Sequence, residues 1–278
     1  MRLRIGAATD TGRVRKLNED VYMFRAEQGL FVVCDGMGGA PAGEVASQIA
    51  AETILEQLNG STQDTAASQT TDEQHYLPQT NRLAEAVRRS NHVIYTHAQE
   101  DPKRAGMGTT MVGVWITQHV ASVAHVGDSR AYLWHHDHLE PLTRDHSLVE
   151  AQVSAGLLDR EQSLHSKQQN ILVRVLGRES EVDVELNEVP VRPGDYLLLC
   201  SDGLTRMVPE RTLSQAIFQL RHPQRICDYL IAAANGNGGA DNITVVAVEV
   251  RGSFWRRLSN QWRRLTKGGH GAEGHPAV

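Results

Sequence analysis

Apolar and polar residues alternate along this chain in two recurring patterns, short apolar runs and longer amphipathic segments. The apolar runs have the length of β-strands and predict strands at residues 3–9, 21–25, 30–35, 108–114, 119–126, 132–135, 139–142, 182–189, 195–201 and 243–250. Apolar residues at helical spacing predict helices at residues 43–58, 81–99, 209–220 and 223–235. In the first of these helices, the residues expected to face the core are Val45, Ile49, Ile54 and Leu58. The length of 278 residues allows one large domain or two smaller ones.

Acidic residues stand at the ends of four predicted strands. The run from residue 30 ends in Asp35 and a glycine-rich turn, the run from residue 195 ends in Asp202, and a third strand ends in Asp128. Asp241 and Asn242 immediately precede the last strand. Carboxylate and carbonyl oxygens are the ligands of hard cations, and glycines let the backbone approach closely enough to offer a carbonyl. Since no histidine belongs to this set, the sequence predicts an all-oxygen cluster that binds Mg²⁺ or Mn²⁺ rather than zinc.

Composition restricts the class of protein further. The net charge is −5, but residues 251–278 carry six Lys or Arg and one acid, which leaves the preceding 250 residues at −10. This balance and the lack of a DNA- or RNA-reading motif argue against a nucleic-acid partner. Three isolated cysteines form no disulfide framework or zinc motif, and the N-terminus has no apolar signal core. We therefore expect a cytoplasmic protein.

Three further polar segments offer candidate chemistry. In residues 15–20, Arg15 is a planar partner for phosphate oxygens, and Glu19 and Asp20 could serve metal-bound water, although a solvated turn has the same composition. Residues 135–138 contain three histidines, which a hairpin turn explains better than a metal site, because the side chains lie at its tip. Residues 143–147 hold adjacent Asp, His and Ser, which cannot converge as a catalytic triad and predict a helix N-cap instead.

Seven ordered motifs together resemble the protein phosphatase 2C (PPM) family of metal-dependent Ser/Thr phosphatases, most closely its bacterial branch. The motifs are Arg15-Lys16-Leu17-Asn18-Glu19-Asp20, Asp35-Gly36-Met37-Gly38-Gly39, Gly108-Thr109-Thr110, Val126-Gly127-Asp128-Ser129-Arg130, Leu142-Thr143-Arg144-Asp145-His146-Ser147, Cys200-Ser201-Asp202-Gly203-Leu204 and Gly239-Ala240-Asp241-Asn242-Ile243-Thr244. One Asp-Gly pair is weak support, whereas seven motifs in the family's order are strong support. The resemblance covers residues 6–250, nearly all of the chain before its basic end.

The resemblance implies an α+β fold, a four-layer αββα sandwich of two antiparallel β-sheets flanked by helices. It implies hydrolysis of phosphoserine and phosphothreonine by in-line attack of a hydroxide that bridges two divalent ions, Mg²⁺ or Mn²⁺. The resemblance implies that Asp35 is a ligand of both ions, that Asp202 and Asp241 complete the first ion's site, and that the Gly36 carbonyl binds the second ion, with Glu19 and Asp20 acting there through bound water. It also implies that a third ion can bind near Asp128 and Asp202. Arg15 is expected to hold the substrate phosphate, and Thr109 and Asn242 are expected to support the site. Met37 stands where eukaryotic members have a histidine, and Ala40 where many bacterial members have one.

Three alternatives remain beside this function. They are a pseudoenzyme that only binds phosphoproteins, a metal-dependent hydrolase of another phosphoester or of nucleic acid, and a chain whose basic end is its main functional module. The complete set of acids argues against the pseudoenzyme. For a phosphatase the expected partners are phosphoproteins, targets of a cognate Ser/Thr kinase. Polar residues 156–170 are expected to form a flap that contacts them.

The chain is expected to divide into a catalytic domain, residues 1–250, and a basic amphipathic tail, residues 251–278, whose end is disordered. Apolar residues of the tail recur at helical spacing opposite its arginines, namely Phe254, Trp255, Leu258, Trp262 and Leu265. This pattern suits peripheral contact with the inner face of a membrane, docking on a partner, or packing on the chain's own domain. Cys34 and Cys200 precede two of the cluster acids and are expected to lie near one another.

Overall fold

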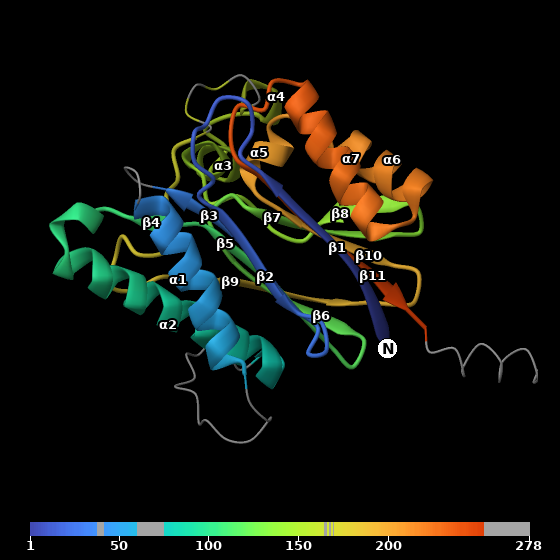
Figure 1. Cartoon of the computed structure of the whole chain (residues 1–278), viewed down its shortest axis with the longest axis horizontal. Coiled ribbons are helices and arrows are strands. Elements are labelled where there is room, and N and C mark those ends of the chain that lie inside the picture. Colours follow the sequence, from blue (N-terminus) through green and yellow to red (C-terminus); the bar gives the residue numbers. More distant parts are fainter. Residues whose placement is uncertain (38–41, 60–74, 164–165, 167, 169, 253–278) are drawn as a thin grey trace, which may run out of the picture.

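A computed structural model describes residues 1–37, 42–59, 75–163, 166, 168 and 170–252. It contains two antiparallel β-sheets with helices on their outer sides (Figure 1). The five-stranded sheet has the order β1 (Arg2–Asp10), β11 (Ile243–Arg251), β10 (Tyr196–Cys200), β7 (Arg130–His135) and β8 (His138–Pro141). The six-stranded sheet has the order β2 (Asp20–Arg25), β3 (Leu30–Met37), β5 (Met111–Thr117), β6 (Val120–Val126) and β9 (Glu185–Pro190), and β4 (Gly108–Thr109) pairs with the end of β3.

Long helices cover the outer side of each sheet (Figure 1). The six-stranded sheet carries α1 (Ala42–Gln57) and α2 (Pro78–Glu100), and the five-stranded sheet carries α6 (Glu210–Leu220) and α7 (Pro223–Gly236). The short helices are η2 (Pro102–Arg104), α3 (Leu148–Ser154), α4 (Arg160–Ser163) and α5 (Asp202–Thr205). The predicted four-layer αββα sandwich is confirmed. None of the helices in the described part of the chain combines the length and apolar character that a membrane span requires.

Three apolar clusters hold the layers together. One lies between the sheets and includes Phe31 and Val33 of β3, while Leu30, Val32 and Cys34 of the same strand face α1 and α2. Both faces of β3 are therefore buried, which explains why its sequence is a continuous apolar run rather than an alternating one. The third cluster fills the space between the five-stranded sheet and the pair α6 and α7.

The expected proximity of Cys34 and Cys200 is wrong. Cys34 belongs to the cluster beneath α1 and α2, and Cys200 belongs to the cluster beneath α6 and α7. Both side chains point away from the interface between the sheets, because they share their strand faces with the outer clusters. Both are buried free thiols that fill core space.

The core face of α1 differs in part from the expected one. Ile54 and Leu58 are buried as predicted, but Val45 and Ile49 are only half-buried, and alanines occupy the centre of the buried face. Small residues suit a close approach of the helix to the strands. A Cβ atom on Gly36 would lie 2.2 Å from the carbonyl oxygen of Gly43, so the start of α1 rests directly on the end of β3.

The histidine-rich segment 135–138 is a tight hairpin turn, as predicted. His135 pairs with His138 across β7 and β8, and the two residues between them, His136 and Asp137, have φ angles of 47° and 65°. Two left-handed residues are the geometry of the turn that joins twisted antiparallel strands. The predicted glycines Gly38 and Gly39 and the amphipathic residues of the tail from 253 onward lie outside the described residues.

Candidate metal centre

The predicted acids converge on one cleft at an end of the sandwich. The cleft has a volume of about 510 Å³ and is lined by Arg15, Glu19, Asp35, Gly36, Asp128, Asp202, Asp241 and Asn242 among the predicted site residues. Asp20 and Thr109 lie behind this lining: Asp20 pairs with Asp35 across β2 and β3, and the Thr109 hydroxyl donates to the Asp35 carbonyl oxygen at 2.9 Å. Strand ends from both sheets thus deliver carboxylates to the same space.

Burial and mutual repulsion make these carboxylates hard to ionise without a cation. Burial raises the pKa of Asp20 to about 7, and the neighbouring Asp202 and Asp241 add to the effect. Burial likewise raises the pKa of Asp128 to about 7, although Arg206 opposes it. The pKa of Asp35 is raised well above its usual value, first by burial and then by four surrounding carboxylates. Such a concentration of negative charge is stable when a cation compensates it.

Several carboxylate oxygens of the cluster lack a hydrogen-bond donor within the described residues. These buried atoms are Oε1 of Glu19, Oδ1 of Asp20 and Oδ1 of Asp202. A buried polar atom without a partner costs free energy, so each oxygen is suited to accept a cation or its bound water. All-oxygen donors of this kind match the preference of Mg²⁺ and Mn²⁺, and the residues present therefore fit the divalent ions that the sequence predicts.

Neutral side chains hold the acid-bearing loops in place. The Oδ1 atom of Asn242 accepts the backbone N–H of Glu19 at 2.8 Å, and its Nδ2 donates to the carbonyl oxygens of Thr11 and Leu17. Asn242 thus ties the segment that carries Glu19 to the segment that carries Asp241. The Ser201 hydroxyl donates to Oδ2 of Asp20 at 2.7 Å, a contact that links the two sheets. The sequence analysis did not identify Ser201, because its role depends on which strands face each other.

Two arginines reach into the cleft. Nη2 of Arg15 lies 2.8 Å from Oδ2 of Asp241, and about half of the Arg15 side chain is exposed, 52%. Nη2 of Arg206 lies 3.2 Å from Oδ2 of Asp128 and also contacts Oδ2 of Asp202. Sequence analysis missed Arg206, although its spacing of four residues from Asp202 on a short helix is a recognised signal for an ion pair.

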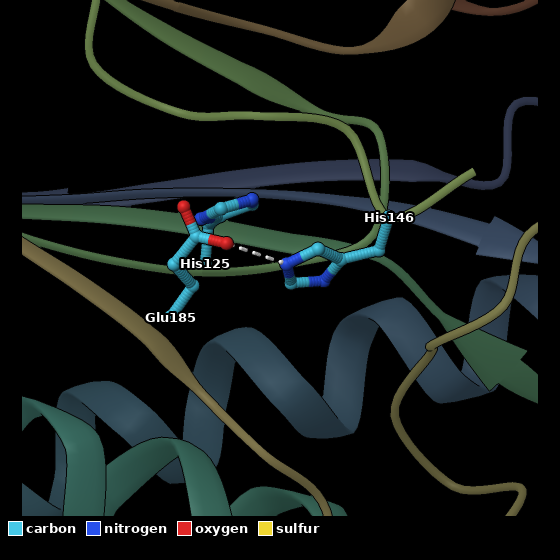
Figure 2. Close-up of side chains that lie close together, drawn as sticks. All are labelled: His125, His146 and Glu185. Atoms are coloured by element: carbon cyan, nitrogen blue, oxygen red, sulfur yellow. Dashed lines mark hydrogen bonds and ion pairs between the residues drawn. The ribbon is translucent and has the colours of Figure 1, made fainter. Parts of the chain in front are cut away.

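Close to the cleft, His125, His146 and Glu185 form a compact group that resembles a metal site (Figure 2). The imidazole rings stack with their centroids 4.4 Å apart, and Oε2 of Glu185 lies 3.2 Å from Nε2 of His146. Burial and the neighbouring His146 lower the pKa of His125 to about 4, so His125 is neutral. Its Nε2–H donates to the carbonyl oxygen of Arg144 at 2.8 Å.

The hydrogen bonds of His146 argue against a metal ion in this group. Its Nδ1 accepts the backbone N–H of Gly127 at 3.1 Å, so the ring proton lies on Nε2 and is donated to Glu185. A metal ion on Nε2 would require both ring nitrogens to be deprotonated. The guanidinium of Arg174, 3.3 Å from the same Nε2, is positively charged and would repel a metal ion at this position. The group instead holds Gly127, the residue before Asp128, in place. The backbone N–H of His146 adds a second contact, because it donates to the Gly127 carbonyl oxygen.

The segment 143–147 has the structural role predicted for it. Ser147 is the N-cap of α3, and its hydroxyl accepts the N–H of Glu150 at 3.2 Å. Asp145 forms two hydrogen bonds of 2.7 Å with Arg130. The three adjacent side chains therefore point to different partners and do not form a triad.

Comparisons with known proteins agree with this geometry. The sequence model described as protein phosphatase 2C matches residues 12–228. The serine/threonine phosphatase stp of Listeria innocua is 39% identical over 244 residues, 87% of this chain and 93% of the relative. The crystal structure of the Mycobacterium tuberculosis serine/threonine phosphatase PstP/Ppp superposes with a TM-score of 0.81 at 32% identity, covering 91% of this chain and all of the other. The catalytic domain of PstP in complex with two manganese ions gives 0.76 at 33% identity, covering 90% and 99%.

Proposed function

This chain belongs to the protein phosphatase 2C family, and we infer from that membership and from its acid-lined cleft that it is a metal-dependent serine/threonine protein phosphatase. Its substrates are phosphoproteins. The observation that carries the inference is the convergence of Asp35, Asp128, Asp202 and Asp241 on one cleft, because a set of oxygen donors without a resident cation would repel itself.

The residues that would hold two divalent ions come from both sheets. Asp35 lies centrally, since its carboxylate faces the other acids, and we assign it to both ions. Asp202 and Asp241, from the five-stranded sheet, would complete one site, and Glu19 with the Gly36 carbonyl would complete the other. The buried Asp20 would support the second site through bound water. When bound, the pair of ions activates water and neutralises charge on the phosphoryl group.

Arg15 is the residue best placed to hold the substrate phosphate. It comes from the loop between β1 and β2, is half exposed, and reaches Asp241 at the cleft wall. A guanidinium can bind two phosphate oxygens at once and fixes the orientation of the group for in-line attack. Thr109 is assigned an indirect role, because its hydroxyl donates a hydrogen bond to the Asp35 carbonyl oxygen and so helps to position Asp35.

The decisive experiment measures phosphate release from a phosphothreonine peptide. We expect release with Mn²⁺, none after chelation, and recovery when Mn²⁺ is restored. Asp35→Asn tests the assignment of the site, with the exposed Glu27→Gln as the matched charge control. Full activity of Asp35→Asn would contradict the assignment. Hydrolysis of nucleic acid or of a small phosphodiester, without hydrolysis of the peptide, would indicate the alternative hydrolase, and metal-dependent peptide binding without turnover would indicate the pseudoenzyme.

The tail is proposed as a separate unit from the catalytic domain, residues 1–250. This proposal is supported by strand β11, which ends at Arg251 and is the last strand, in chain order, of the described five-stranded sheet. We propose that the tail contacts the inner face of an anionic membrane from the cytoplasm, because its sequence places tryptophans opposite arginines on a helical projection. Co-sedimentation with anionic vesicles, lost at high salt and in a 1–250 truncation, would support this. Equal sedimentation of both chains would contradict it.

A cognate Ser/Thr kinase is proposed as the source of the substrates. A phosphatase without a kinase acting on the same proteins would have nothing to reverse. Phosphoprotein profiles with and without the phosphatase would identify sites that one kinase also phosphorylates. A profile that does not change would contradict the pairing.

A further inference from the structure

Arg206 occupies a defined position between two acids of the cleft. It follows α5, and its backbone N–H donates to the Asp202 carbonyl oxygen at 2.9 Å. Its side chain turns back along this helix, so that Nη2 contacts Oδ2 of Asp202 and lies 3.2 Å from Oδ2 of Asp128. The side chain is 29% exposed and lines the cleft. A single guanidinium group therefore bridges the carboxylate of Asp128, which lies between β6 and β7, and the carboxylate of Asp202, which begins α5.

The two oxygens of Asp202 have different surroundings. Oδ2 faces Arg206, whereas Oδ1 is buried and has no hydrogen-bond donor among the described residues. Asp202 can thus direct Oδ1 toward a divalent ion while Oδ2 stays paired with the arginine. Oδ2 of Asp128 and Oδ2 of Asp202 are both paired with Arg206, so neither of these two oxygens is free to bind a further cation.

The resemblance to bacterial phosphatases predicted a third ion near Asp128 and Asp202. In this chain the guanidinium of Arg206, a positive group, lies against the two carboxylates from which that ion would take its ligands. A divalent ion there would lose carboxylate oxygens to the guanidinium and would meet a like charge a few Å away.

We propose that Arg206 is a built-in cation that replaces the third divalent ion, so that the cluster binds two ions. The inference rests on the proposed function. Arg206 is a positioning residue in this account: it compensates the charge of Asp128 and orients Asp202 for the ion on its other oxygen.

The test counts bound Mn²⁺ by equilibrium dialysis, with free Mn²⁺ measured by electron paramagnetic resonance. The full-length wild-type chain is expected to bind two ions. Arg206→Ala is expected to bind a third, at least about tenfold more tightly than the wild type does, because a like charge has been removed from the position. Arg206→Lys keeps the charge and should remain at two. Arg211→Ala, an exposed arginine of α6, controls for net charge and should also remain at two.

A second variant shows where the additional ion binds. Adding Asp128→Asn to Arg206→Ala should return the count to two. If Arg206→Ala fails to fold by circular dichroism, Arg206→Met, which keeps the apolar stem, is expected to gain the third ion in its place. Equal affinity for a third ion in the wild type and the neutral variants would overturn the inference, as would a third ion that persists without Asp128. A wild-type chain that binds no Mn²⁺ would overturn the proposed function, and this inference with it.

Discussion

The metal-free protein should become less stable as the pH rises, because the cleft acids repel one another once they ionise. Burial raises the pKa of both Asp20 and Asp128 from 3.8 to about 7. In the unfolded chain the same groups ionise near their usual values. Between about pH 4 and pH 7 the folded state therefore binds more protons than the unfolded state, so the free energy of unfolding falls as the pH rises through this window.

The size of the effect follows from the two pKa values. From pH 5 to pH 7, one such carboxylate removes about 2 kcal/mol of stability, because the slope of 1.36 kcal/mol per pH unit halves as the pH reaches the folded-state pKa. A domain of this size changes its melting temperature by about 2–4 °C per kcal/mol, so a single carboxylate corresponds to about 4–8 °C. The raised pKa of Asp35 acts in the same direction. Bound divalent ions keep these groups ionised and cancel the loss.

Thermal unfolding followed by circular dichroism at pH 5, 6, 7 and 8 measures this, in chelator and in Mn²⁺. We expect the melting temperature to fall with pH in chelator alone. Asp35→Asn should flatten that dependence, because it removes the carboxylate that four others face. Glu27→Gln, an exposed acid in the turn between β2 and β3, should leave it unchanged. A melting temperature in chelator that is constant over this range, or a steeper dependence in Asp35→Asn, would refute the reasoning.

Four further outcomes are expected. Asp202→Asn and Asp241→Asn should each lower turnover by more than about 100-fold while the circular-dichroism spectrum stays that of a folded protein, since both carboxylates are assigned to one ion. Arg15→Ala should raise KM by about tenfold with kcat nearly unchanged, and lysine should restore it only in part; an unchanged KM would count against the phosphate contact. His146→Ala should destabilise the protein by about 1–3 kcal/mol in denaturant titrations, because a buried backbone N–H loses its acceptor. Replacing both Ile171 and Val173 with serine should reduce activity on a phosphoprotein more than on a small aryl phosphate, because these exposed apolar side chains flank Leu172 of the cleft lining.

The acids could be found from the sequence because each one ends or begins a strand whose apolar run is itself a local signal. Asp35, Asp128 and Asp202 follow such runs, and Asp241 precedes one. The order of the seven motifs along the chain then indicated that these acids belong to one site, which the local pattern around each acid does not show. Ser201 could not be found in this way, since its partner Asp20 lies in a distant strand that only the packing of the two sheets brings close. Arg206 has a local signal toward Asp202, four residues before it, but its contact with Asp128 also depends on that packing.

The errors came from treating closeness in sequence as closeness in space. Cys34 precedes Asp35 by one residue and Cys200 precedes Asp202 by two, yet each thiol lies in the outer apolar cluster of its own sheet, on a strand face that points away from the other sheet. In α1, large apolar residues were expected to mark the core face, but the close contact between Gly36 and Gly43 leaves room mainly for alanine along the buried side. The position of the two cysteines and the core face of α1 both depend on distances between strands and helices, which the pattern of hydrophobic residues does not give.

The acids of the cleft belong to two groups, and the contact between the sheets sets the distance between them. Asp20 and Asp35 lie in strands of the six-stranded sheet, whereas Asp202 follows β10 and Asp241 precedes β11, both strands of the five-stranded sheet. Their repulsion tends to open this end of the sandwich. Neutral hydrogen bonds oppose the opening, from Ser201 to Asp20 and from the Glu19 N–H to Asn242, and an apolar cluster fills the space between the sheets. These contacts are made among the chain's own residues and involve no cation, so they hold the acid-bearing segments together independently of the ions. The free energy of ion binding then neutralises the charge of the acids and is not consumed by ordering the chain. This favours a site whose geometry is the same in every catalytic cycle.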